Sequence, residues 1–132
     1  MKEIKSIYHV GIRVRDLDIT RAFYEKLGFE FLAGPLGPEP VAIMEHPSGV
    51  NINLILNASA DASEKNILMD VPEKHTGYTH MSLEITDREA VRKALAANDM
   101  PITETINLPN GGVFLFIREP DCNVVVFDVT GK

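Results

Sequence analysis

The chain has almost no cysteine and no long hydrophobic run. Cys122 is the only cysteine among 132 residues, so no internal disulfide can form, and we expect a reducing compartment. No stretch approaches the roughly 20 consecutive apolar residues of a membrane-spanning helix. The first ten residues, MKEIKSIYHV, lack the apolar run and the small-residue cleavage site of a signal peptide. These absences predict a cytoplasmic protein with no membrane partner.

Positive charge is also scarce. The 13 lysines and arginines are outnumbered by 19 aspartates and glutamates, which gives a net charge of -6. A nucleic-acid-binding protein presents a basic face to phosphates, so we expect no nucleic-acid partner. Neither of the common glycine-rich phosphate loops occurs. With 45% hydrophobic residues, the chain can bury a core as one domain or as two small halves.

Two segments, one in each half of the chain, are similar to each other. The first runs from His9 to Asp16 (HVGIRVRD) and the second from His80 to Asp87 (HMSLEITD). Each opens on a histidine, and its alternating apolar residues predict a strand with one face in a core. Each ends on an aspartate that can cap a following helix. This pattern indicates a duplicated unit.

The same order of elements then repeats in both halves. Helical apolar spacing follows each capping aspartate, and in the first half it involves Ile19, Ala22, Phe23 and Leu27. Three prolines within residues 34–40 predict a loop there. Further extended segments are expected at residues 41–46 and 50–57 in the first half, and at 101–106, 113–117 and 124–129 in the second.

We therefore predict an α+β fold of two paired β-α-β-β-β modules that form a cupped, eight-stranded mixed sheet. Residues 1–132 form a single domain, with module one at about 4–57 and module two at about 78–130. The small, polar segment 58–77 is the predicted linker. One sheet face of each module is covered by its helix. The other faces are polar, and we expect them to form a cup that binds a ligand.

Four segments together resemble a known family. They are HVGIRV with Asp16, FYEKLGF at residues 23–29, GYTHMSL at 77–83, and EPDCNVVVF at 119–127. The last is similar to the family's Asp-Pro-Asp-Gly-Asn-x-x-Glu entry into its final strand. The chain thus resembles the vicinal oxygen chelate superfamily, which includes glyoxalase I, bleomycin-resistance proteins, extradiol dioxygenases and methylmalonyl-CoA epimerase. The fold hosts many activities, so the resemblance specifies the fold more than the function.

The resemblance implies a divalent metal, Zn, Ni, Fe or Mn, bound by residues from the first and last strands of both modules. The first-strand positions fall on His9 and His80. The last-strand positions fall on Asn53, where family enzymes often have Glu or Gln, and on Val126, where they have Glu. Imidazole and carboxylate suit these metals, but Val126 has no donor atom and Asn53 offers one neutral oxygen. The implied ligand set is therefore incomplete.

Three carboxylates are the available replacements for the missing ligand. Glu84 shares the strand face of His80 but lies four residues further on, roughly 13 Å along the strand. Asp128 lies two residues beyond Val126, about 7 Å away, and is the best of the three. Glu45 depends on a strand register that the sequence does not define.

The remaining cup positions predict ligand contacts. Arg13 points to the cup by alternation, where it either binds an anionic group of the ligand or forms a salt bridge with its repeat-equivalent Glu84. We expect Asn53 and Val126 to contact the ligand as well. Cys122 replaces the turn glycine of the family motif, and we interpret it as a turn residue. The phenylalanines at positions 114, 116 and 127 are expected in the core, with one of them lining the cup.

Two functions of different class stay open. The first is a glyoxalase/bleomycin resistance/dioxygenase-family protein that binds a small molecule in its cup, with no metal and an incomplete ligand set. The alternative is a metal-dependent lyase or dioxygenase of the lactoylglutathione lyase type, which uses His9, His80 and a third ligand. Whether the chain is an enzyme is thus undecided by the sequence. In either case the resemblance implies a homodimer, because cups of this family are commonly completed by a partner chain.

Overall fold

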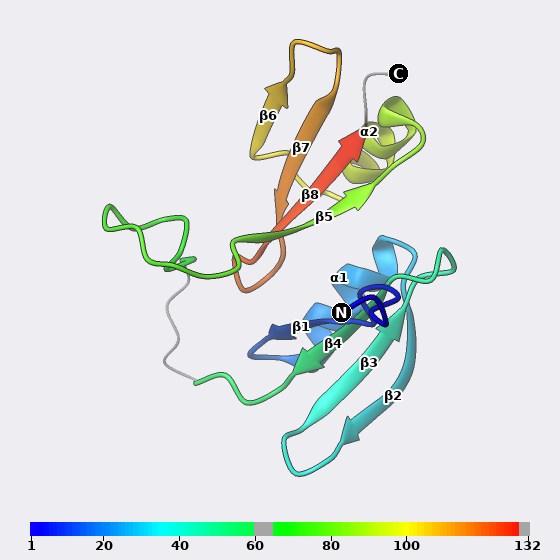
Figure 1. The fold of residues 1–132 in the computed structure, drawn as a ribbon, viewed down its shortest axis with the longest axis vertical. Coiled ribbons are helices and arrows are strands. Elements are labelled where there is room, and N and C mark those ends of the chain that lie inside the picture. The colour runs from blue at the N-terminus through cyan, green and yellow to red at the C-terminus, as the bar shows by residue number, and fades with distance from the viewer. Residues whose placement is uncertain (60–64, 130–132) are drawn as a thin grey trace. The chain divides into compact units, whose positions relative to one another are not determined.

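The computed structural model describes residues 1–59 and 65–129, and the chain divides into two compact units, 1–62 and 63–132. The first unit, module 1, contains β1 (Val10–Arg13), α1 (Leu17–Lys26), β2 (Glu30–Leu36), β3 (Val41–Glu45) and β4 (Asn51–Ile55). Module 2 contains β5 (His80–Glu84), α2 (Arg88–Ala97), β6 (Glu104–Asn107), β7 (Val113–Arg118) and β8 (Val124–Val129) (Figure 1). The predicted α+β fold of two β-α-β-β-β modules is confirmed. Residues 60–64 of the predicted linker lie outside the described residues.

The eight strands divide into two four-stranded mixed sheets of identical topology. Their orders are β1-β4-β3-β2 and β5-β8-β7-β6. The first and last strands of each module pair in parallel, and all other pairs are antiparallel. In the parallel pairs Gly11 lies opposite Asn53, and Ser82 lies opposite Val126. Positions 53 and 126 are therefore equivalent in the two modules.

Both helices begin where the sequence predicts. The side chain of Asp16 accepts the backbone N–H of Ile19 at 3.0 Å, and that of Asp87 accepts the N–H of Ala90 at 3.0 Å. Each aspartate thus satisfies one of the free N–H groups in the first helical turn. Among the described residues, no helix combines the length and the hydrophobicity needed to cross a bilayer.

The predicted buried stripe of α1 is partly wrong. Ile19 is 57% exposed and Ala22 is also exposed, whereas Phe23 is buried as expected. The buried positions are shifted by one residue, because the way the helix packs on its sheet decides which face is buried. The buried side chains of α1 are Thr20, Phe23 and Tyr24.

The predicted loop at residues 34–40 begins later than expected, because β2 continues through Pro35 to Leu36. β2 is an edge strand, so a proline without an N–H donor is tolerated there. Its pairing with β3 is irregular on both sides of Ala33. At the irregularity Gly34 has a φ of +132°, and a Cβ on it would lie 2.6 Å from Ala42 Cα. The close approach of β2 and β3 therefore requires glycine.

We predict that Gly34→Ala destabilises module 1 by about 3 kcal/mol, since it adds backbone overlap to the strain of a left-handed conformation. Gly49 is the matched control, because its φ is +98° but no atom lies within 4 Å of an added Cβ. Gly49→Ala should cost only about 1–2 kcal/mol. Urea denaturation measures both values, and equal losses would contradict the proposed overlap.

Candidate functional site

The sheet of module 2 has one buried face and one face that carries the histidine. On β7, Val113, Leu115 and Ile117 are buried, at 2%, 0% and 1% exposed, so the alternate residues point to the opposite side. The strand register then identifies the neighbours on that side, because paired residues share a face. We call it the His80 face, and it comprises His80, Ser82, Glu84, Glu104, Ile106, Phe114, Phe116, Arg118, Val124, Val126 and Asp128.

His80 opens β5 at one end of this face, and its side chain is oriented by a neighbour. Its Nδ1 lies 2.8 Å from the Thr79 hydroxyl, and its ring centroid lies 6.3 Å from that of Phe116. Because Thr79 engages Nδ1, Nε2 is the ring nitrogen that would meet a ligand. Phe116 provides apolar surface beside it. Of the three phenylalanines expected in the core, Phe127 is buried at 6% exposed, whereas Phe114 and Phe116 lie on the His80 face.

Val126 lies on the His80 face, as the family motif implies, and is 2% exposed. It pairs with Ser82 on one side and Phe116 on the other. The residue directly opposite His80 is Val124, which is also apolar. Among the described residues, no three His, Cys, Asp or Glu side chains are grouped so that they could hold a metal ion. The donor set around His80 in module 2 therefore does not fit a divalent metal.

The replacement carboxylates of module 2 lie away from His80. Glu84 and Asp128 are directly opposite each other in the β5–β8 ladder, four positions beyond the pair formed by His80 and Val124. At about 3.3 Å per residue, both lie roughly 13 Å along the sheet from the histidine. Asp128, the best replacement ligand on sequence grounds, is thus not brought to His80 within its module.

The equivalent face of module 1 carries the other predicted residues. Asn53 is half-buried and lies between Gly11 on β1 and Ile43 on β3. Glu45, whose register was undefined, pairs with Asn51 and so shares the face of Asn53. His9 precedes β1 and is exposed. His9 and His80 belong to different modules, so their convergence stays a prediction.

Arg13, the last residue of β1, has two polar partners in its own module. Its Nε donates to Asn57 Oδ1 at 2.9 Å, and its Nη2 lies 3.6 Å from Glu39 Oε1. Asn57 Nδ2 also donates to Glu39 Oε1, at 3.1 Å. The two partners hold the guanidinium near the end of the strand while more than half of the Arg13 side chain stays exposed.

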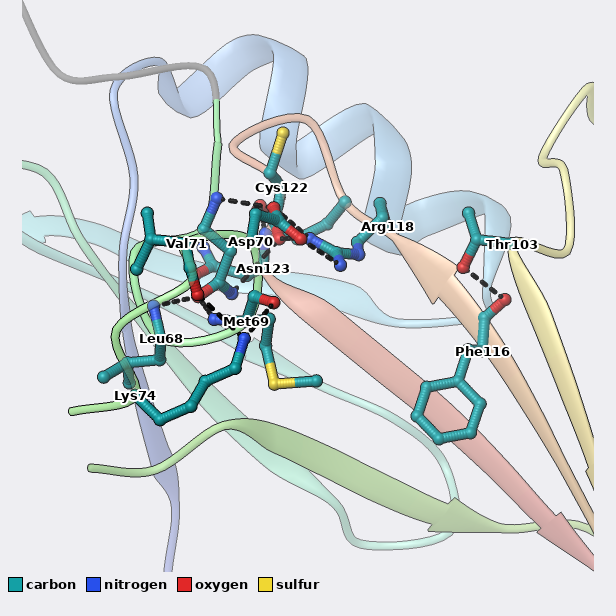
Figure 2. A network of polar contacts seen from close by, with 12 residues as sticks. Leu68, Met69, Asp70, Val71, Lys74, Thr103, Phe116, Arg118, Cys122 and Asn123 are labelled. Atoms are coloured by element: carbon teal, nitrogen blue, oxygen red, sulfur yellow. Dashed lines mark hydrogen bonds and ion pairs between the residues drawn. The ribbon is translucent and has the colours of Figure 1, made fainter. Parts of the chain in front are cut away.

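The His80 face of module 2 carries an ion pair that the sequence analysis did not identify. It lies at the end of the face where His80 is found. Arg118 donates to both carboxylate oxygens of Asp70, at 2.9 and 2.8 Å, and to the backbone oxygen of Cys122 at 3.0 Å. The Asn66 side chain donates to that same Cys122 oxygen at 3.3 Å (Figure 2). These contacts attach the segment before β5 to the turn between β7 and β8.

The ion pair changes the acidity of both partners. The hydrogen bonds from Arg118 and, next, from the Asn66 N–H hold the pKa of Asp70 below its usual value of 3.8. The bond to Asp70 raises the pKa of Arg118. No local pattern marks this pair, because the two residues are distant in sequence. Only the alternation of β7 could have placed Arg118 on the His80 face.

The turn between β7 and β8 is built around a buried carboxyl group. Glu119 Oε1 accepts the backbone N–H groups of Asp121 and Asn123, at 2.7 and 2.8 Å. Glu119 is 2% exposed, and its Oε2 is buried with no hydrogen-bond partner among the described residues. Burial raises the pKa of Glu119 to about 7. Cys122 adopts a φ of +65° in this turn, at the position where the family motif has glycine, which fits its interpretation as a turn residue.

We predict that Glu119 makes module 2 less stable as the pH rises from about 4.5 to above 7. Its pKa is about 7 in the folded chain and about 4.5 in the unfolded chain, so the folded state binds the proton more tightly. The stabilisation is present at pH 4.5 and below, and is lost as the pH rises through 7. The corresponding decrease in the free energy of unfolding is about 3 kcal/mol.

Glu119→Gln should therefore raise the midpoint of thermal unfolding by several degrees at pH 8 and change it little at pH 5. Glu73→Gln is the control, because Glu73 is exposed and its ion-pair partner is His75. A shift for Glu119→Gln that is the same at both pH values would contradict the buried-charge explanation.

The comparisons with known proteins agree with this architecture. The family model of the Glyoxalase/Bleomycin resistance protein/Dioxygenase superfamily matches residues 6–127. The chain belongs to this superfamily, which confirms the resemblance found in the sequence. No curated protein matches the chain in sequence.

Solved structures share the fold at low identity. A glyoxalase family protein from Enterococcus faecalis is 21% identical with a TM-score of 0.78, covering 94% of this chain and 97% of its own. A lactoylglutathione lyase from Agrobacterium tumefaciens is 20% identical with a TM-score of 0.69, covering 96% and 95%. The fosfomycin resistance protein FosX from Listeria monocytogenes is 15% identical with a TM-score of 0.70, covering 96% and 93%. At such identities the likeness establishes the fold alone.

Proposed function

We propose that this protein binds a small organic molecule on the His80 face of module 2 and the equivalent face of module 1, and does so without a metal. The observation that carries the proposal is Val126. It occupies the β8 position where metal-using relatives of the resembled family have a glutamate, and it is a buried aliphatic side chain. A metal at His80 would lack the negative charge that a carboxylate supplies.

The residues on these faces suit a ligand with both polar and apolar parts. In module 2, His80 Nε2 and the Ser82 hydroxyl offer hydrogen bonds, while Phe114 and Phe116 offer aromatic surface. In module 1, the Asn53 amide can donate and accept. Binding sites for small molecules are commonly built in this way, from apolar walls and a few polar groups that fix orientation.

One observation favours the alternative, a metal-dependent lyase or dioxygenase that uses His9 and His80. Metal-binding histidines usually have their second ring nitrogen held by a hydrogen bond, which fixes the orientation of the ring. Thr79 engages Nδ1 of His80 in this way. The same contact would also orient an imidazole that binds an organic ligand directly, so the alternative requires a metal-uptake test.

We further propose, from the family resemblance and the single cysteine, that the protein acts as a cytoplasmic homodimer. Light scattering coupled to size-exclusion chromatography tests the oligomeric state. A monomer at micromolar concentration would refute the dimer and leave the ligand proposal unaffected.

We predict that the wild-type protein takes up no stoichiometric Zn, Ni, Mn or Fe(II) in equilibrium dialysis followed by elemental analysis. Val126→Glu should bind these metals more tightly than the wild type, because it adds the carboxylate that metal-using relatives have. The neutral Val126→Gln should increase the metal affinity much less. Both variants need a circular dichroism check of folding. About one metal ion per wild-type chain, lost in His80→Ala, would establish the alternative instead.

We also predict that purified protein retains a small molecule that denaturation releases for identification by mass spectrometry. Ser82→Ala should weaken binding of that molecule by about five- to tenfold, through the loss of one hydrogen bond. Thr105→Ala is the matched control, since Thr105 pairs with Leu115 and points to the opposite face of the sheet. Equal effects of the two substitutions would place the ligand elsewhere.

A further inference from the structure

Arg118 is a charged group on the His80 face, which otherwise presents mainly aliphatic, aromatic and acidic side chains. The neighbouring Ile117 is 1% exposed on the other side of β7, so Arg118 projects from the His80 face. It pairs with Val124, and Val124 pairs with His80. The arginine and the histidine are therefore two strands apart at the same end of the sheet, a separation of roughly 10 Å.

The partner of Arg118 is a carboxylate from outside the sheet. Asp70 belongs to the segment of residues 65–77, which contains no helix or strand. Its two oxygens lie 2.8 and 2.9 Å from the guanidinium, the two-pronged geometry in which arginine binds any carboxylate. The two side chains are 29% and 30% exposed, so water and small solutes can reach the pair.

The segment that carries Asp70 keeps its own shape through local hydrogen bonds. Asn66 Oδ1 accepts the N–H groups of Leu68 and Met69, at 2.9 and 3.2 Å, and Lys74 Nζ donates to the Val71 oxygen at 2.8 Å. Its contacts with the β7–β8 turn and β7 include the bond from Asn66 to the Cys122 oxygen and the Asp70–Arg118 ion pair (Figure 2). The hydrogen bonds of Asn66 Oδ1 and Lys74 do not involve the Asp70 side chain, so an exchange of partners at Arg118 would leave them intact.

We propose that Arg118 is the binding site for a carboxylate group of the ligand, and that Asp70 occupies this site in the free protein as a built-in competitor. The ligand carboxylate replaces Asp70 on the guanidinium, and the remainder of the ligand extends along the His80 face toward His80. The inference rests on the proposed function, because it takes the His80 face as the ligand-binding face.

The test uses acetate as the probe and the side-chain Nε–Hε resonance of Arg118 in ¹⁵N NMR as the readout, at constant ionic strength kept with chloride. The resonance is assigned by its loss in Arg118→Gln. In Asp70→Asn the competing charge is gone, while the amide oxygen can still accept the Asn66 N–H. Acetate should then bind at Arg118 about tenfold more tightly than in the wild type, since apparent affinity falls with the fraction of sites that are free.

Glu73→Gln is the control for the loss of one negative charge in the same segment, because Glu73 is paired with His75 and not with Arg118. It should bind acetate as the wild type does. Inorganic phosphate is the second probe. Its affinity for Arg118 should increase less than that of acetate in Asp70→Asn, because the site is shaped by a planar carboxylate. If phosphate gains more, the site selects tetrahedral anions and the carboxylate proposal is wrong.

Failure of this inference is distinct from failure of the proposed function. No acetate-dependent shift of the Arg118 resonance in Asp70→Asn would make the ion pair purely structural, whatever molecule the protein retains. Conversely, an acetate response in Asp70→Asn supports the carboxylate site even if the wild-type protein proves to hold a metal at its histidines.

Discussion

The structure depends on the parallel pairing between the first and last strand of each module. Parallel neighbours cannot be joined by a tight turn, and in each module the chain passes through a helix and two further strands before it returns to its own first strand. This pairing sets Gly11 beside Asn53 and Ser82 beside Val126. The register decides which side chains can meet a ligand, because a slip of one residue would exchange the two faces of the sheet.

Much of this architecture was predictable from short-range patterns. Alternating residues identified the strands, and the aspartates at 16 and 87 identified both helix starts, since capping is a local interaction. The errors arose where tertiary contacts decide. The rotation of the α1 stripe away from Ile19 depends on how the helix meets its sheet, and the extension of β2 through Pro35 depends on its place at the sheet edge.

The candidate site was predictable only where a motif marks it. The similarity of EPDCNVVVF to a family pattern placed Val126 on the final strand, and the register agrees with that placement. The pair of Asp70 and Arg118 has no such signature, because a segment without regular structure can bring a carboxylate to many positions on a sheet. The burial of Glu119 was equally unpredictable, since a glutamate next to Arg118 and Pro120 in a polar turn is normally exposed.

The alternation along β7 and β8 separates two kinds of evolutionary constraint. Substitutions at the inward positions, such as Leu115 and Phe127, disturb packing and are opposed by selection for folding. Those on the His80 face between them change the functional groups offered to a ligand, although a side chain at position 126, where Val126 is 2% exposed, must also pack. A lineage can therefore lose a metal-binding carboxylate at position 126 in a single step and keep its fold. Descendants of one duplicated ancestor can in this way diverge in chemistry far faster than in shape.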